Sequence, residues 1–147
     1  GSREIEHFRS FGAEVHAPHL LGFVQTIATH ASLAERWGEA AFWYEVLAQA
    51  ALHPHTRALA YEKAGVAHIE LGHLPRAKTM FNALRDFEAR EVVALGNLGL
   101  IAELEGDTEL ARDYYDEVIA KDHDGRAAEW ARGRRAALPA PSAGNGP

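Results

Sequence analysis

The sequence predicts an all-α fold: an α-solenoid of about three antiparallel helical hairpins, with one more helix at each end. Two observations lead to this class. Gly38, Gly72 and Gly106 recur at intervals of 34 residues, and each separates two stretches of helical apolar periodicity. Glycine is also the usual residue just past the end of a helix. We therefore expect each of the three glycines to form the turn of a hairpin.

The residues around these glycines have the alternation of small and large side chains that closely packed helices require. Seven residues before the glycines the chain has small residues, namely Ala31, Gly65 and Gly99. Nine residues after them it has large apolar ones, namely Leu47, Phe81 and Tyr115. Trp43 stands where the later repeats have Ala77 and Ala111. We expect Trp43 to widen the helix spacing there or to reach toward the N-terminal helix.

With this period and this pattern, the sequence resembles the tetratricopeptide repeat family. The best copies of the repeat are residues 95–119 and 61–84, and the first repeat is degenerate. The resemblance covers about residues 24–125. It implies a TPR-like α-solenoid in which the first helix of each hairpin lines a concave groove, and such grooves commonly bind peptides or helices.

The helices are assigned in chain order. Residues 1–17 hold a Gly-Ser tag scar and then a helix, since Ile5, Phe8 and Phe11 are spaced three apart. The repeat helices are expected near residues 18–37, 39–52, 55–71, 74–88, 90–105 and 108–121, with Pro18, Pro75 and Asp107 near their starts. A capping helix at about 126–137 completes the repeat domain 18–137. Residues 138–147 are rich in Pro, Gly and Ser, and we expect a disordered tail.

Composition excludes several kinds of chemistry. The chain has 147 residues, a net charge of −6 and no cysteine, so disulfides and thiolate catalysis are excluded. The acidic balance argues against nucleic acid as a partner, and the basic stretch Arg132–Arg135 is interpreted as a solvated helix face. No apolar run is long enough for a membrane span. The lack of cysteine fits a reducing compartment, and we expect a cytoplasmic protein without a membrane partner.

No catalytic or metal motif is recognisable. The nine histidines show no HExxH spacing, and His68 falls in a packing position of the repeat. There is no G-x-S-x-G, P-loop or G-x-G-x-x-G motif. We therefore predict that the chain is not an enzyme and expect no catalytic residues, cofactor or metal.

The candidate site is the groove that the family resemblance implies. The first repeat would contribute Gln25, Thr29, Ser32 and Arg36. The second and third would contribute Leu59, Glu62, Lys63, Val66, Ile69, Glu70, Val93, Asn97, Leu100, Glu103 and Leu104. The basic carboxylate clamp found in some members is incomplete, because Val66 and Val93 stand at polar positions. The apolar members together form a patch larger than soluble monomers usually expose. An alternative is that the phase is off by one residue, so that several of them are core.

These observations favour a protein–protein interaction module, a scaffold or adaptor that binds a peptide or amphipathic helix in its groove. The alternative is a homodimerisation module that uses the same groove, or a regulatory domain cut from a larger protein. The N-terminal helix could also cover the groove, in its own chain or in a second copy.

The aromatic run Arg36–Leu47 could form a ligand-stacking site, a partner surface or a packing seam. The sequence favours packing, with Trp43 and either Trp37 or Phe42 against Phe8 and Phe11.

Overall fold

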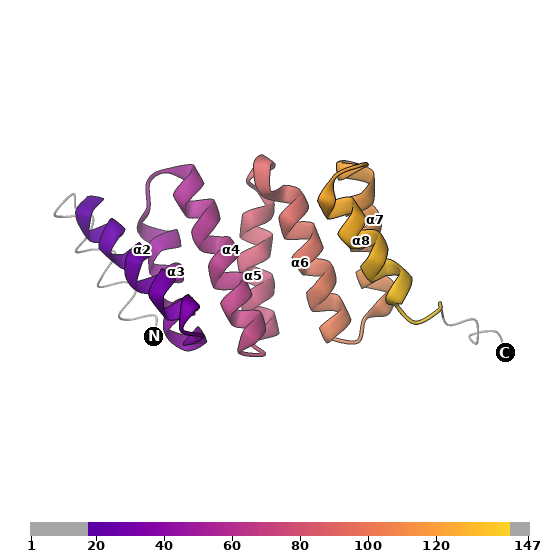
Figure 1. Cartoon of the computed structure of the whole chain (residues 1–147), viewed down its shortest axis with the longest axis horizontal. Helices are drawn as coiled ribbons and strands as arrows, with labels where there is room; N and C mark the ends of the chain where they lie inside the picture. Colours follow the sequence, from indigo (N-terminus) through magenta and orange to yellow (C-terminus); the bar gives the residue numbers. More distant parts are fainter. Residues whose placement is uncertain (1–17, 142–147) are drawn as a thin grey trace. The chain divides into compact units, whose positions relative to one another are not determined.

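The computed structural model describes residues 18–141, which form helices and no strand (Figure 1). The all-α class is therefore confirmed. The chain divides into two compact units, the first ending at Phe87 and the second beginning at Glu88. We describe each unit by itself, so the single repeat domain expected over residues 18–137 stays a prediction. The expected N-terminal helix and most of the expected tail lie outside the described residues.

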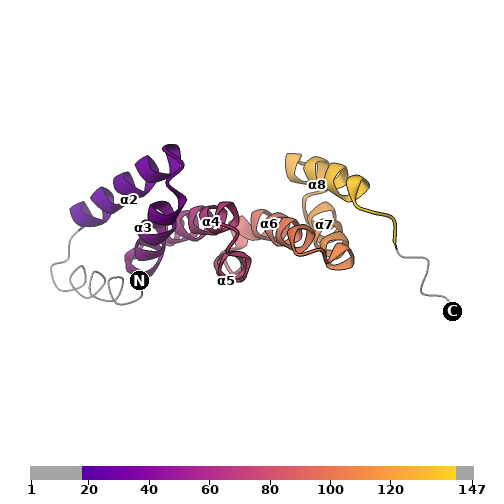
Figure 2. The ribbon, with the colours of Figure 1, turned by 90° about the horizontal axis from the view of Figure 1, so that it is seen from below.

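From residue 18 onward, the first unit forms two antiparallel hairpins. Its helices are α2 (Pro18–Leu33), α3 (Trp37–Ala50), α4 (Pro54–Glu70) and α5 (Leu74–Arg85). Helix α3 packs against both α2 and α4, and α5 packs against α4. Figure 2 shows α2 above α3 and α4 above α5. Many residues of this core are alanines, among them Ala28, Ala40 and Ala64, which let the helix axes approach closely.

The turns of the second and third repeats use glycine, as the sequence predicts. Gly72 has φ +75° and Gly106 has φ +81°, the left-handed conformation that glycine adopts without a steric penalty. In each turn the glycine N–H donates to the carbonyl three residues back, and the following N–H donates to the carbonyl five residues back. These bonds satisfy carbonyls at the end of each helix.

The prediction that Gly38 is the first hairpin turn is wrong. Gly38 lies inside α3, and Glu35 occupies the left-handed position with φ 58°. The N–H groups of Glu35 and Arg36 make the same pair of bonds as those of Gly72 and His73. Glu35 and Gly72 are 37 residues apart, whereas Gly72 and Gly106 are 34 apart. The 34-residue interval from Gly38 is therefore coincidental.

This shift changes the register of the first repeat. Ala40, not Trp43, is equivalent to Ala77 and Ala111, and all three are fully buried. Their N–H groups accordingly donate to the N-cap carbonyls of Arg36, His73 and Asp107. Tyr44, not Leu47, is equivalent to Phe81 and Tyr115. The expectation that Trp43 replaces a small residue is thus corrected, because the first repeat has its alanine three residues earlier.

The aromatic run packs against the core. Trp37, Phe42 and Trp43 are partly buried against the cluster that contains Tyr44 and Leu47. The rings of Phe42 and Trp43 meet edge to face, with centroids 4.9 Å apart. The predicted packing role is confirmed for these three residues. The predicted contact with Phe8 and Phe11 lies outside the described residues.

The second unit contains the 3₁₀ turn η1 (Glu88–Arg90), α6 (Glu91–Leu104), α7 (Thr108–Asp122) and α8 (Arg126–Ala137). Helix α7 packs against both α6 and α8. Tyr115 of α7 is fully buried, and its ring meets Trp130 of α8 edge to face at 5.6 Å. Helix α8 lies where the sequence predicts the capping helix.

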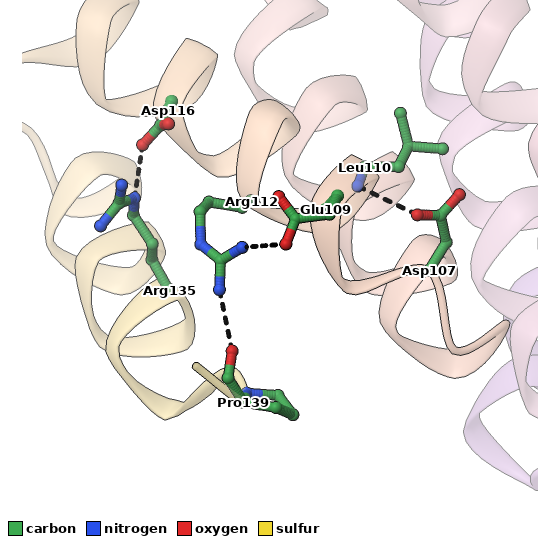
Figure 3. A network of polar contacts seen from close by, with 7 residues as sticks. All are labelled: Asp107, Glu109, Leu110, Arg112, Asp116, Arg135 and Pro139. Atoms are coloured by element: carbon green, nitrogen blue, oxygen red, sulfur yellow. Dashed lines mark hydrogen bonds and ion pairs between the residues drawn. The ribbon is translucent and has the colours of Figure 1, made fainter. Parts of the chain in front are cut away.

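Polar contacts hold the start of α7 and the segment that follows α8 (Figure 3). Asp107 caps α7, since its Oδ1 accepts from the N–H of Leu110 at 3.1 Å. Arg112 bonds Glu109 and the carbonyl oxygen of Pro139, each at 2.8 Å. Leu138 also packs against the core. The chain thus stays attached to α7 for at least two residues past the end of α8.

Candidate interaction surface

In the first unit, the predicted groove residues form an accessible line along α4. Leu59, Glu62, Val66 and Ile69 are half-buried, and Lys63 and Glu70 are exposed. The rest of the helix supplies the buried residues Ala58, Ala60, Ala64, Gly65, Ala67 and His68. None of the six predicted residues belongs to the core, so the one-residue phase error considered above did not occur on α4.

In the second unit, the predicted residues form a similar line on α6. Val93, Asn97, Leu100 and Glu103 are half-buried, and Leu104 is 55% exposed. The buried residues of α6 are Ala94, Leu95, Gly96, Leu98, Gly99, Ile101 and Ala102. Val93, Leu100 and Leu104 are therefore apolar side chains that the unit leaves partly in contact with solvent.

Two polar members of the α6 line are already engaged within the unit. Asn97 Nδ2 donates to the carbonyl of Val93 at 2.9 Å. Glu103 accepts from Tyr115 Oη at 2.6 Å and from Arg134 Nε and Nη2 at 3.2 and 2.6 Å. Glu103, expected as a groove residue, thus connects α6 to α7 and α8.

The chemistry of this triad is set by burial and charge. Burial, together with the hydrogen bond to Glu103, raises the pKa of Tyr115 well above its usual value. The bond to Glu103 also raises the pKa of Arg134.

The first-repeat members follow the corrected register. With the offset of 37 residues, Gln25, Thr29 and Ser32 correspond to Glu62, Val66 and Ile69. Thr29 Oγ1 lies 2.8 Å from the carbonyl oxygen of Gln25 and 3.3 Å from Tyr44 Oη. Arg36 was assigned to the groove wrongly. It is the N-cap residue of α3, and its Nε donates to Glu39 Oε2 at 2.8 Å.

Sequence reasoning missed a buried polar cluster that joins three helices of the first unit. His68 of α4 is buried, as expected, and its Nε2 lies 2.7 Å from Glu45 Oε2 of α3. Arg76 of α5 donates to the other oxygen of Glu45. Burial alone would raise the pKa of Glu45, but the bonds from His68 and Arg76 outweigh it and hold that pKa below its usual value. The signal available was Glu45 itself, a charged residue that stands among buried positions in the middle of α3.

The basic stretch Arg132–Arg135 is used inside the second unit. Arg132 donates to the carbonyl of His123 at 2.9 Å, and Arg135 to Asp116 Oδ1 at 2.5 Å. With Arg134 on Glu103, all three guanidinium groups have partners within the unit. A shallow concavity on α8 is lined by Arg126, Glu129, Trp130, Gly133 and Arg134.

The described residues hold neither a candidate metal site nor a candidate membrane span. Within residues 18–141, no three His, Asp or Glu side chains come together in a way that could hold a metal ion. None of the helices in this range has the length and apolar character that crossing a membrane requires.

Comparison with known proteins agrees with the repeat geometry. No protein-family model matches the chain. Over 94 residues, 61% of its length, the chain is 30% identical to cellulose synthase operon protein C of Komagataeibacter xylinus, and it spans 7% of that protein. Its structure is similar to the tetratricopeptide repeat domain of Arabidopsis OM64, with a TM-score of 0.65 and 16% identity. That match covers 79% of this chain and 93% of the other. The chain therefore has the fold of a tetratricopeptide repeat domain.

Proposed function

We propose that the chain is a protein–protein interaction module. The accessible face of α4 in the first unit and that of α6 in the second would each bind a peptide or amphipathic helix of a partner. The similarity to a tetratricopeptide repeat domain supports such a role in general. A scaffold or adaptor of this kind needs no cofactor. The absence of cysteine fits a cytoplasmic setting for this role.

The observation that carries the proposal is the row of apolar side chains on α6. Leu100 and Leu104 lie one turn apart, and Val93 lies two turns before Leu100. An amphipathic helix presents apolar residues at the same spacing, so the two rows could interdigitate. Complete burial of one Leu side chain gives about 1.5–3 kcal/mol, so a few such contacts are enough for micromolar binding.

We expect the charged residues beside the apolar side chains to contribute less to the binding affinity. Lys63 and Glu70 are exposed on α4, and ion pairs at exposed sites contribute about 0–1 kcal/mol each. They would set the orientation of a bound segment more than its affinity. We therefore expect a partner with a row of large apolar residues and few strict charge requirements.

A peptide selected from a displayed random library against the full chain gives a defined probe. Leu100→Glu should weaken its binding at least about tenfold, because a carboxylate would have to be desolvated in the contact. Leu110→Glu is the matched control, since Leu110 is also an exposed Leu but lies on α7. Equal losses in both variants, or no loss with Leu100→Glu, would contradict the proposal.

The corresponding test on α4 uses Ile69→Glu, with Leu52→Glu as control because Leu52 is 92% exposed and lies outside the helices.

The Leu100→Glu variant also distinguishes the homodimer alternative. If two copies pair through these faces, sedimentation should show a dimer that Leu100→Glu dissociates, and the selected peptide should compete with it. A monomer at high micromolar concentration removes that alternative.

A further inference from the structure

Helix α8 carries a glycine that is in series with two glycines that hold aromatic rings. Gly65, Gly99 and Gly133 recur at intervals of 34 residues. Phe81 lies against Gly65 and Tyr115 against Gly99, so close that a Cβ on either glycine would stand 2.6 Å from the ring. In both cases the aromatic residue comes sixteen positions after its glycine, on the helix that follows. The series therefore marks Gly133 as a third position where a ring can approach the backbone.

The space over Gly133 is open. A Cβ built on this glycine would meet nothing within 4 Å among the described residues, and the glycine itself is exposed. Gly133 also belongs to the concavity on α8, together with Arg126, Glu129, Trp130 and Arg134. Residues 134–147 contain no aromatic side chain, so they supply no ring for this position.

The side chains that line the concavity favour an aromatic occupant. Trp130 already meets Tyr115 edge to face, but 43% of its surface stays exposed. A ring placed over Gly133 can pack on that exposed part, and aromatic pairs gain stability beyond the area they bury. Arg134, which Glu103 holds in place, lines the same concavity, and guanidinium groups stack on aromatic rings. An aliphatic side chain would gain neither contact.

We propose that the concavity on α8 binds a helix of a protein partner, and that this helix places an aromatic side chain over Gly133. The partner helix would pack on α8 as α7 packs on α6, where Tyr115 covers Gly99. The chain already makes this kind of contact twice, so α8 can accept it without rearrangement. The inference rests on α8 alone and does not depend on binding at the accessible faces of α4 and α6.

The hairpin of α6 and α7 indicates where the partner needs an acidic residue. Lys121 Nζ lies 2.7 Å from Glu91 Oε1, and Lys121 comes six positions after Tyr115. With the period of 34 residues, Arg126 stands next to the α8 position that is equivalent to Glu91. Arg126 is exposed, and no described carboxylate pairs with it. An acidic residue about six positions after the partner's aromatic residue would therefore complement Arg126.

Helix α8 differs from α6 at one position that bears on the choice of partner. Leu95 of α6 is fully buried in the same core cluster as Val118 of α7, which comes three positions after Tyr115. Glu129 stands at the position of Leu95 on α8. A valine packed there would desolvate a carboxylate. Helix α7 of a second copy is thus unsuited, and the partner should have a polar or basic residue at that position.

The test selects helical peptides from a displayed library against the full chain, with counter-selection against Gly133→Leu. The added side chain fills the concavity, and it leaves the fold intact because the space at this position is open. We expect the recovered peptides to carry an aromatic residue with an acidic residue about six positions later. Replacing that aromatic residue by Ala should weaken binding at least about tenfold. Recovery of no peptide that discriminates the two chains, or of peptides without an aromatic residue, would overturn the proposal.

The matched control is Gly22→Leu, because the Cβ position of Gly22 in α2 is also open. Its affinity for the selected peptide should equal that of the unchanged chain, and circular dichroism should show that both variants keep their helices. In NMR spectra the indole N–H of Trp130 should shift on titration, while those of Trp37 and Trp43 stay in place. Equal losses in Gly133→Leu and Gly22→Leu would contradict the proposal. So would a sedimenting dimer that Gly133→Leu dissociates, since a second copy would then occupy the concavity.

Discussion

The ring of Tyr115 lies directly against Gly99, so that a Cβ on Gly99 would come within 2.6 Å of Tyr115 Cε1. Phe81 has the same relation to Gly65, again at 2.6 Å. Both rings are fully buried. The glycines are therefore required for packing, because they let an aromatic ring of the second helix of each hairpin touch the backbone of the first helix.

Gly99→Ala should destabilise the protein. The added methyl group meets a ring that cannot move away, and overpacking of this kind costs about 1–3 kcal/mol, partly offset by the better helix propensity of Ala. Gly133→Ala is the control, since nothing lies within 4 Å of its Cβ position in α8. Urea unfolding should show a lower midpoint for Gly99→Ala and an equal or higher one for Gly133→Ala. The reverse order would contradict this packing.

The first turn offers a test of the corrected register. Glu35 adopts a left-handed conformation that costs about 1–2 kcal/mol for a residue with a Cβ. Glu35→Gly removes that cost but adds unfolded-state entropy, so we expect a net gain of about 0.5–1 kcal/mol. Gly72→Ala should be destabilising by a similar amount. If Glu35→Gly proved destabilising and Gly38→Ala showed the loss instead, Gly38 would be the turn after all.

The difference between these repeats shows what the sequence could predict. The register of the second and third repeats could be predicted from the sequence. Gly72 and Gly106 mark their turns, and Gly65 and Gly99 mark the positions where aromatic rings approach the backbone. The first repeat has a Glu at its left-handed position, so no residue type marks the turn. Gly38 then provided a false marker at the right interval. Alanines at several nearby positions of α3 allowed either register.

For the candidate site, the positions implied by the family resemblance include Leu59, Val66, Leu100 and Leu104, and the structure leaves these side chains accessible. Helical periodicity does not predict which charged side chains of different helices come into contact. Glu45 and His68 are 23 residues apart, and Glu103 and Arg134 are 31 apart. Such pairs depend on helix crossing angles and side-chain reach, which the sequence of one helix does not contain. Glu103 was for that reason expected in the groove, without its bonds to Tyr115 and Arg134.

The Glu45 cluster predicts an acid-dependent part of the stability. The pKa of Glu45 in the folded protein lies below the usual 4.5. The contribution of its carboxylate to the free energy of unfolding is therefore fully present above pH 4.5 and is lost as the pH falls through the folded pKa. Glu45→Gln should cost about 1.5–3 kcal/mol at pH 7, and its difference from wild type should shrink below about pH 4. Glu109→Gln, which removes an exposed carboxylate paired with Arg112, should change stability by less than about 0.5 kcal/mol. A pH-independent effect of Glu45→Gln would contradict the charged cluster.

Tyr115 should resist ionisation while the protein is folded. Burial and the bond to Glu103 raise its pKa far above the usual 10.0. The chain has four tyrosines in all, so Tyr115 is one of four phenols in a titration. In an ultraviolet titration to about pH 11, Tyr115→Phe should leave the phenolate absorbance of the folded chain unchanged. The same substitution should reduce that absorbance once the chain is unfolded in guanidinium. A reduction already present in the folded protein would show that Tyr115 is accessible to base.

Methyl NMR of the full chain with the selected peptide tests most directly whether the accessible faces of α4 and α6 bind a partner. The account predicts that the methyl signals of Val66, Ile69, Leu100 and Leu104 shift on titration, while those of Leu52 and Leu110 stay in place. Shifts confined to Leu52, Leu110 or the core of either unit, with the α4 and α6 methyl groups unmoved, would contradict it.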